Sequence, residues 1–278
     1  MRVGRIPYIN CYPVYGAIDR KVVALDAQLI DGVPTALNRA MAAGALDVSV
    51  ISAVEYARDA ARYLLLPDLA ISCDGPVRSV MLFSRRPAET LEGGRVLVSR
   101  SSMTSVALLQ LMFEQVWHSA PAFVPADAEI ADLARTGVES HDARLIIGDA
   151  ALMLTSGHSA LAADYPHVYD LGAVWKEWTG LPFVFAVWVA QRTTPVAGAL
   201  AVHAQLIQSR NWGLAHLDQL SAQAAVATGV SKPAALAYLS GLDYGLRYEH
   251  LAGLTTFFGK LAASGRVPNG SLAFLPAA

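Results

Sequence analysis

Residues 5–15 read RIPYINCYPVY, an apolar strand pattern that runs into a segment with one amide side chain between two prolines. Apolar residues flank Asn10 on both sides, which sets it apart from an ordinary surface residue. Burying an amide without hydrogen-bond partners costs about 2–7 kcal/mol, so an asparagine in this setting either caps a turn or faces a ligand. The local sequence favours the turn cap. The choice between a turn cap and a ligand-facing residue depends on the rest of the chain.

Strand and helix patterns alternate outward from this segment, which predicts an α/β fold. The capping-box spacing of Ser52 and Glu55 predicts that a helix opens there. The chain after Pro195 is expected to be mostly helical. The expected strands are 3–9, 46–51, 70–73, 77–84, 94–99, 144–147 and 183–190, and the clearest helices are 34–44, 52–62 and 104–117.

The length of 278 residues exceeds what one hydrophobic core usually carries, which favours two lobes. A change of composition at residues 85–87 marks the start of a second strand and helix alternation. We therefore expect lobe I to comprise residues 1–86 and 191–278, with residues 87–190 inserted as lobe II. This layout predicts a ligand cleft between the lobes, at the carboxyl ends of the strands.

Composition excludes several functional classes. The chain is 54% hydrophobic and 16% charged, but much of the apolar share is alanine and the run at 183–190 is far shorter than the ~20 residues of a membrane helix. The net charge of −2 without a basic run argues against nucleic acid as a partner. The N-terminus lacks a secretory pattern, and Cys11 and Cys73 have no metal or redox spacing, so we expect a cytoplasmic protein with two unpaired thiols.

Hydroxyl side chains form two further candidate groups. Ser79 follows the turn at 74–76 and is available either to face a cleft or to bond to the backbone. Residues 99–105 place several hydroxyls at the start of a helix, where free N–H groups bind carboxylates or phosphates. One hydroxyl would suffice as a helix cap, so the excess favours an anion site; its members are Ser101, Ser102, Thr104 and Ser105.

Asp149 follows a strand and opens a helix, so it is either a helix cap or a cleft carboxylate that orients a ligand or acts as a base. The aromatic segment 175–183 is either core packing or an apolar wall for a ring-shaped ligand. The chain has no phosphate-binding loop, dinucleotide fingerprint, nucleophile elbow or metal-spaced group of His or Cys, so we expect neither a metal nor a cofactor.

Five segments occur in an order that resembles one family: IPYINCYP (6–13), LDVSVIS (46–52), GPVRSV (75–80), the loop 101–105 and WTGLPF (178–183). The resemblance covers nearly the whole chain and is to the chorismate dehydratases of the futalosine route to menaquinone. It implies the two-lobed fold of type 2 periplasmic binding proteins. It also implies loss of water from chorismate to give 3-[(1-carboxyvinyl)oxy]benzoate, without a cofactor.

The resemblance implies roles for individual residues. Asn10 would be catalytically central, Ser79 would be the active-site serine, and the loop 101–105 would hold a substrate carboxylate. Gly180 and Pro182 of the WTGLPF segment would belong to the substrate site. An amide is not a general base at neutral pH, so our hypothesis is that the enolpyruvyl carboxylate of the substrate takes the proton, with Asp149 as the alternative base.

Two rival functions stay open. The paralogous dihydroxynaphthoate synthase of the same pathway shares the fold but opens with a different motif from the INCYP of this chain. A solute-binding protein for a small carboxylate would also suit the fold, because fold alone does not assign function. The oligomeric state is not predicted by any of these patterns.

Overall fold

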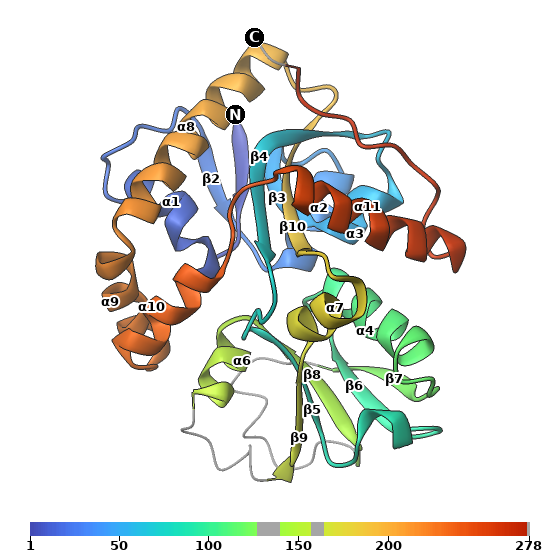
Figure 1. Ribbon diagram of the computed structural model, residues 1–278. Coiled ribbons are helices and arrows are strands. Elements are labelled where there is room, and N and C mark those ends of the chain that lie inside the picture. The colour runs from blue at the N-terminus through green and yellow to red at the C-terminus, as the bar shows by residue number, and fades with distance from the viewer. Residues whose placement is uncertain (127–139, 157–163, 277–278) are drawn as a thin grey trace.

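The computed structural model describes residues 1–126, 140–156 and 164–276 (Figure 1). Two five-stranded mixed sheets form the centres of two lobes, with orders β2-β1-β3-β10-β4 and β7-β6-β8-β5-β9. The strands are β1 Arg2–Arg5, β2 Gln28–Asp31, β3 Val48–Ser52, β4 Tyr63–Cys73, β5 Val80–Ser84, β6 Arg95–Ser99, β7 Ala122–Ala126, β8 Ala143–Ile147, β9 His167–Asp170 and β10 Phe183–Gln191.

Helices cover both faces of the first sheet: α1, α8, α9 and α10 lie on one side, and α2, α3 and α11 lie on the other (Figure 1). The described helices are α1 Tyr12–Asp19, α2 Pro34–Ala42, α3 Ala53–Arg58, α4 Thr104–Gln115, α6 Gly148–Thr155, α7 Leu171–Thr179, α8 Val196–Ala215, α9 Leu217–Thr228, α10 Lys232–Gly241 and α11 Tyr248–Ala263, with 3-10 turns η1 Ile9–Cys11 and η2 Ala88–Thr90. The predicted α/β class is confirmed.

One strand of each sheet runs against its neighbours. β10 pairs antiparallel with both β3 and β4, and β5 pairs antiparallel with both β8 and β9. β10 reads FVFAVWVAQ and is buried along nearly its whole length, as a central strand covered on both faces requires. β1 pairs parallel with both β2 and β3, and β6 pairs parallel with both β7 and β8.

These pairings correct the expected lobe boundaries. The boundaries at 86 and 191 place β5 in lobe I and β10 in lobe II, but the sheets place β5 in the second lobe and β10 in the first. The chain therefore crosses between the lobes at residues 74–79 and 180–182. The composition change at 85–87 marks the outer end of β5, because polar residues appear where a buried strand reaches the surface.

The first strand also differs from the expected range 3–9. β1 ends at Arg5 rather than at Ile9, because Pro7 has no N–H to give to a neighbouring strand. Asn10 lies in the single turn η1, and Pro13 sits in the first turn of α1, a position that proline tolerates well. The turn that holds Asn10 thus runs directly into helix α1.

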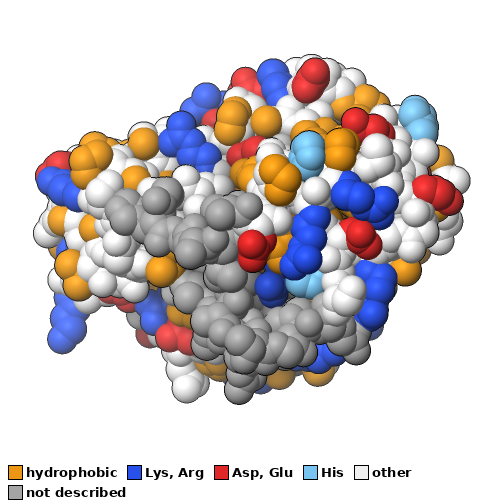
Figure 2. All heavy atoms as spheres, turned by 90° about the horizontal axis from the view of Figure 1, so that it is seen from below, with side chains coloured by type: hydrophobic (Ala, Val, Ile, Leu, Met, Phe, Trp, Pro, Cys, Tyr) orange, Lys and Arg blue, Asp and Glu red, His pale blue; other side chains and the backbone are white. Residues whose placement is uncertain are grey.

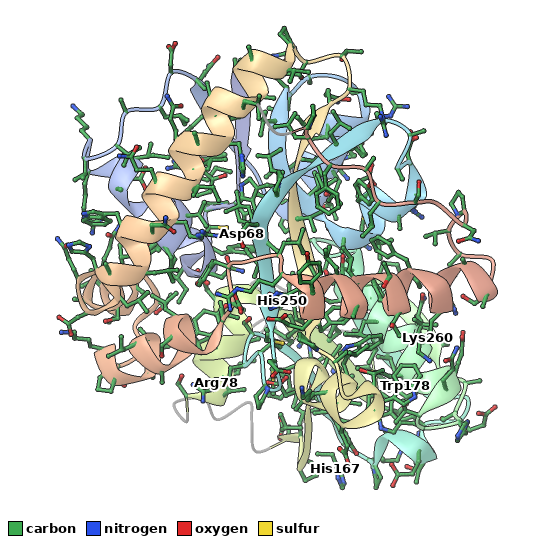
Figure 3. The ribbon with its side chains drawn as sticks, turned by 45° about the horizontal axis from the view of Figure 1, so that its top comes forward. Asp68, Arg78, His167, Trp178, His250 and Lys260 are labelled. Carbon is green, nitrogen blue, oxygen red and sulfur yellow. The ribbon has the colours of Figure 1, made fainter. Side chains whose placement is uncertain are left out.

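Aromatic side chains join the lobes where the chain crosses at 180–182. Trp175 of α7, Phe183 of β10 and Phe257 of α11 pack with ring centroids 4.9–6.0 Å apart. Lys260 of α11 lies over the ring of Trp178 of α7 at 3.9 Å, and Figure 3 shows the two side chains facing each other. The C-terminal helix α11 therefore packs against both lobes.

Candidate active site

A cleft between the lobes encloses about 600 Å³ of empty space, including the part open to solvent. Its walls come from the carboxyl ends of β1 and β3, from the crossing segment and from the first turns of α4 and α6. The lining residues are Ile6, Tyr8, Asn10, Pro34, Ser52, Ile71, Val77, Ser79, Val80, Ser102, Thr104, Ser105, Ile147, Gly148, Phe185 and Ala186.

Asn10 lies on the cleft wall, and its Oδ1 is buried without a hydrogen-bond partner among the described residues. The turn interpretation would have this oxygen cap a backbone N–H, and it does not do so. An unpaired buried amide oxygen costs free energy that the fold does not recover. The arrangement therefore favours the ligand-facing interpretation of Asn10.

Ser79 lies at the end of the crossing segment and is 4% exposed. Its Oγ accepts a hydrogen bond of 2.8 Å from the hydroxyl of Tyr238 in α10 and makes a longer contact of 3.4 Å to the carbonyl oxygen of Val77. The backbone of Ser79 is fixed too, because its carbonyl oxygen accepts from the N–H of Gly148 at 2.8 Å. Both predicted catalytic residues thus line one cleft.

The first turn of α4 supplies three of the predicted hydroxyls. Ser102, Thr104 and Ser105 line the cleft, and Ser101 does not, since it lies on the preceding turn with its N–H bonded to Ser99 Oγ. Ser102 Oγ accepts from the N–H of Ser105 at 3.2 Å. Thr104 Oγ1 accepts from the N–H of Val54 across the cleft at 3.2 Å, so one of these hydroxyls links the two lobes.

Ser52 is a cleft residue to which sequence reasoning gave only a capping role. Its hydroxyl makes no cap bond to α3; instead Asn38 Nδ2 donates to Ser52 Oγ, and Asn38 Oδ1 accepts from the Ser52 N–H, both at 3.0 Å. In the sequence, its position at the end of a buried strand could have indicated that it lines the cleft. Tyr8 and Phe185 were also missed as lining residues.

Asp149 lies beside the cleft rather than on its wall. It sits in the first turn of α6, and its Oδ1 accepts a hydrogen bond of 3.3 Å from the N–H of Ile9. Burial raises the pKa of the Cys11 thiol, and the Asp149 charge adds to that increase. Cys11 is therefore a neutral buried group, and the structure pairs neither Cys11 nor Cys73 in a disulfide, as predicted.

Gly148 explains how α6 comes so close to the cleft. Its φ of +64° favours glycine, and a Cβ there would lie 3.3 Å from the ring of Tyr8, which lines the cleft. Gly180 and Pro182, by contrast, are not lining residues. Gly180 ends α7 with a φ of +73°, and the Pro182 carbonyl accepts from the indole N–H of Trp175 at 3.2 Å. Both shape the crossing segment at 180–182.

The lining residues include no charged side chain. The polar groups are hydroxyls, one amide and the first turns of α4 and α6, whose free N–H groups carry partial positive charge. Figure 2 shows that Lys and Arg side chains are interspersed with Asp and Glu among the described atoms of the face seen from below. An anion would therefore be held by neutral donors in the cleft rather than by a broad positive field.

The described residues contain no group of three or more His, Cys, Asp or Glu side chains placed to hold a metal ion. No described helix is long and apolar enough to cross a membrane. The expectation that the reaction needs neither metal nor cofactor stays a prediction.

The fold is a two-lobed α/β architecture like that of the periplasmic binding proteins. The chain resembles the aliphatic sulphonate binding protein SsuA from Escherichia coli, with a TM-score of 0.63, 15% identity and coverage of 100% of this chain and 94% of that one. Protein AF1704 from Archaeoglobus fulgidus is similar with a TM-score of 0.76, 22% identity and coverage of 96% and 98%.

Sequence comparison gives the family. A family model described as "Menaquinone biosynthesis" matches residues 1–263, so the chain belongs to this family. It is 30% identical over 240 residues to the chorismate dehydratase of Thermus thermophilus, covering 83% of this chain and 85% of that protein. It is 28% identical over 190 residues to the chorismate dehydratase of Campylobacter jejuni, covering 67% and 66%.

Proposed function

We propose that this protein is a chorismate dehydratase, a hydro-lyase that eliminates water from chorismate to give 3-[(1-carboxyvinyl)oxy]benzoate in menaquinone biosynthesis. The observation that carries the proposal is the relationship to named chorismate dehydratases over most of the chain, together with the unpaired amide oxygen of Asn10 in the cleft. The first supports the reaction, and the second supports Asn10 as a group that a bound ligand would satisfy.

The cleft suits a small ring that carries two carboxylates. Ile71 and Phe185 give an apolar surface for the ring. The hydroxyls of Ser102, Thr104 and Ser105, at the first turn of α4, provide donors for one carboxylate. Donors that carry no formal charge bind an anion without holding the aromatic product too tightly, which favours release.

The reaction is an elimination that makes the ring aromatic. A ring C–H bond breaks and its electron pair enters the ring, while the neighbouring C–O bond breaks and the hydroxyl leaves with a proton as water. In our proposal the substrate's enolpyruvyl carboxylate takes the ring proton and passes it to the departing hydroxide, so that water leaves and the carboxylate is restored. Aromatisation supplies the driving force, so the protein has to position the groups and stabilise the departing oxygen.

Asn10 holds the substrate in the reactive geometry. Its amide offers two donors and one acceptor, and the acceptor Oδ1 is the atom left unpaired in the cleft. A substrate hydroxyl would donate to this oxygen, while the amide N–H groups would donate to a carboxylate. Ser79 supplies a further hydroxyl from the crossing segment, and it lines the same cleft as Asn10.

Incubation of the purified protein with chorismate, followed by chromatography, tests the proposal. We expect 3-[(1-carboxyvinyl)oxy]benzoate to accumulate without added metal or cofactor. Binding of chorismate without product would support a solute-binding protein instead, and absence of both binding and product would contradict both functions.

We also propose a cytoplasmic location. The two unpaired, buried thiols Cys11 and Cys73 suit a reducing compartment. Fractionation of the native host with an antibody against the protein tests this, and recovery outside the cytoplasmic fraction would contradict it.

A further inference from the structure

Tyr238 is a buried residue that contacts Ser79 and is not among the residues that line the cleft. It belongs to α10, is 1% exposed, and its hydroxyl donates to Ser79 Oγ at 2.8 Å, a usual length for a strong O–H···O bond. Burial raises the pKa of the Tyr238 hydroxyl well above its ordinary range, so it keeps its proton at neutral pH. Tyr238 therefore has a proton available to donate to Ser79.

A serine hydroxyl has one proton to give and an oxygen that accepts. With the oxygen taken by Tyr238, the proton of Ser79 can point either to the carbonyl oxygen of Val77 or into the cleft. The Val77 contact is 3.4 Å, longer than the 2.5–3.0 Å of an ordinary O–H···O bond. The Ser79 proton is therefore held only weakly by the protein.

Hydrogen bonds hold the backbone around Ser79 in place. Asp170 accepts hydrogen bonds from the N–H groups of Val77 at 3.0 Å and Arg78 at 2.6 Å, and Gly148 donates to the Ser79 carbonyl oxygen. With the main chain fixed, the Tyr238 bond selects one orientation of the hydroxyl.

We propose that Tyr238 is a positioning residue for the dehydration: it fixes Ser79 as a hydrogen-bond donor to an oxygen of the bound substrate. This inference rests on the proposed function. A hydroxyl that already accepts a hydrogen bond is also polarised, which makes it a better donor. Ser79 then acts as an electrophilic group that stabilises negative charge on the substrate, and it does not act as a base or nucleophile.

A double-mutant cycle tests the proposal. Tyr238→Phe removes one hydroxyl and keeps the ring, and we expect kcat/KM for chorismate to fall about tenfold, the effect of losing one hydrogen bond. In a Ser79→Ala background the same change should alter kcat/KM by less than about twofold, because Tyr238 acts only through Ser79. A purely structural role would give the same loss in both backgrounds.

Single-turnover reactions with enzyme in excess extend the cycle to slow variants. Where Ser79→Ala is still too slow, its affinity for chorismate is measured by calorimetry, and adding Tyr238→Phe should leave that affinity within about twofold. A further loss of affinity in this background would overturn the proposal.

Tyr244→Phe is the matched control. Tyr244 is also 1% exposed, and its hydroxyl has no hydrogen-bond partner among the described residues. We expect this variant to keep wild-type kcat/KM, and a loss equal to that of Tyr238→Phe would overturn the proposal. Wild-type protein that does not convert chorismate would contradict the proposed function itself, whereas an active wild type with equal losses in both backgrounds would contradict only the role of Tyr238.

Discussion

The Asp149 carboxylate in the second lobe accepts a hydrogen bond from the backbone N–H of Ile9 in the first lobe, at 3.3 Å. Ile9 directly precedes Asn10. This bond therefore joins the second lobe to the turn that carries the proposed catalytic amide. The position of Asn10 therefore depends on how the two lobes are arranged. Asp149 has a role in this geometry that requires an acceptor oxygen but no proton transfer.

Replacing Asp149 separates a positioning role from that of a base. Asp149→Asn keeps an oxygen that can accept from Ile9, so we expect kcat to stay within about threefold of wild type. Asp149→Ala removes the acceptor and should lower kcat by about tenfold. Steady-state kinetics with chorismate measure both changes. A loss of about 100-fold or more in Asp149→Asn would instead identify Asp149 as the base.

Asn10→Asp tests the role of the amide with almost no change of shape. A carboxylate at this position adds negative charge beside a substrate with two carboxylates, and we expect kcat/KM to fall on the order of 100-fold. Asn269→Asp makes the same chemical change at an exposed site and should leave turnover unaltered. An Asn10→Asp enzyme with wild-type turnover would contradict the role assigned to Asn10.

Gly253 of α11 allows the helix to approach the crossing segment at 180–182. A Cβ at residue 253 would lie 2.0 Å from the carbonyl oxygen of Pro182, whereas one at Gly259 in the same helix meets no atom within 4 Å. We expect Gly253→Ala to lower the free energy of unfolding by about 1–3 kcal/mol. Gly259→Ala should raise it by about 0.5–1 kcal/mol through helix propensity. Urea unfolding measures both, and equal effects would contradict the packing argument.

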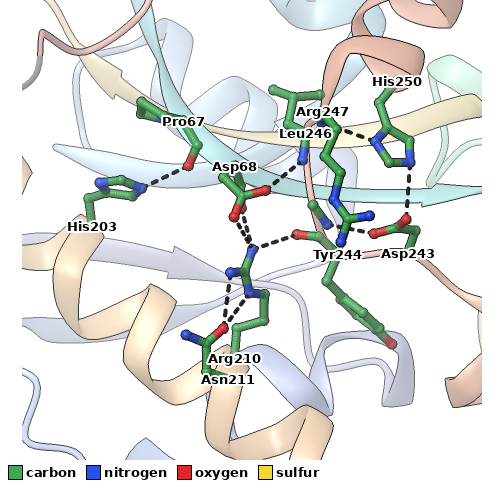
Figure 4. Close-up of polar contacts among 11 residues, drawn as sticks. Pro67, Asp68, His203, Arg210, Asn211, Asp243, Tyr244, Leu246, Arg247 and His250 are labelled. Carbon is green, nitrogen blue, oxygen red and sulfur yellow. Dashed lines mark hydrogen bonds and ion pairs between the residues drawn. The ribbon is translucent and has the colours of Figure 1, made fainter.

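The buried His250 of helix α11 pairs with the partly exposed Asp243 in the segment after α10 (Figure 4). His250 Nδ1 accepts from the N–H of Arg247 at 3.1 Å, so Nε2 carries the proton that faces Asp243 at 3.2 Å. The hydrogen bond from His250 is the largest cause that lowers the pKa of Asp243 from 3.8 to about 2.

This pKa predicts an acid-sensitive contribution to stability. Because the folded pKa lies below the unfolded one, the contribution is fully present above the unfolded value of 3.8 and is lost as the pH falls toward about 2. We expect Asp243→Asn to be less stable than wild type at pH 6, with the difference shrinking over this window. Urea unfolding as a function of pH measures it, with the exposed Asp26→Asn as control. A difference that stays constant down to pH 2 would contradict the linkage.

Much of the cleft was predictable from the sequence because its parts obey local rules. Asn10 follows β1 and Thr104 opens α4, and in an α/β fold such positions lie at the ligand-binding ends of the sheets, while Ser79 follows the turn at 74–76. The apolar run at 183–190 likewise predicted a buried strand, which is β10. Patterns within a few residues were sufficient for these assignments.

The sequence by itself therefore determined the alternation of strands and helices and several of the groups that line the cleft, since both depend on near neighbours. Only the tertiary structure decided which sheet β5 and β10 join, that Ser52 is held by Asn38 rather than capping α3, and that Tyr238 contacts Ser79 from 159 residues away. Pairings between distant segments depend on how the whole chain closes on itself. No local pattern encodes that choice.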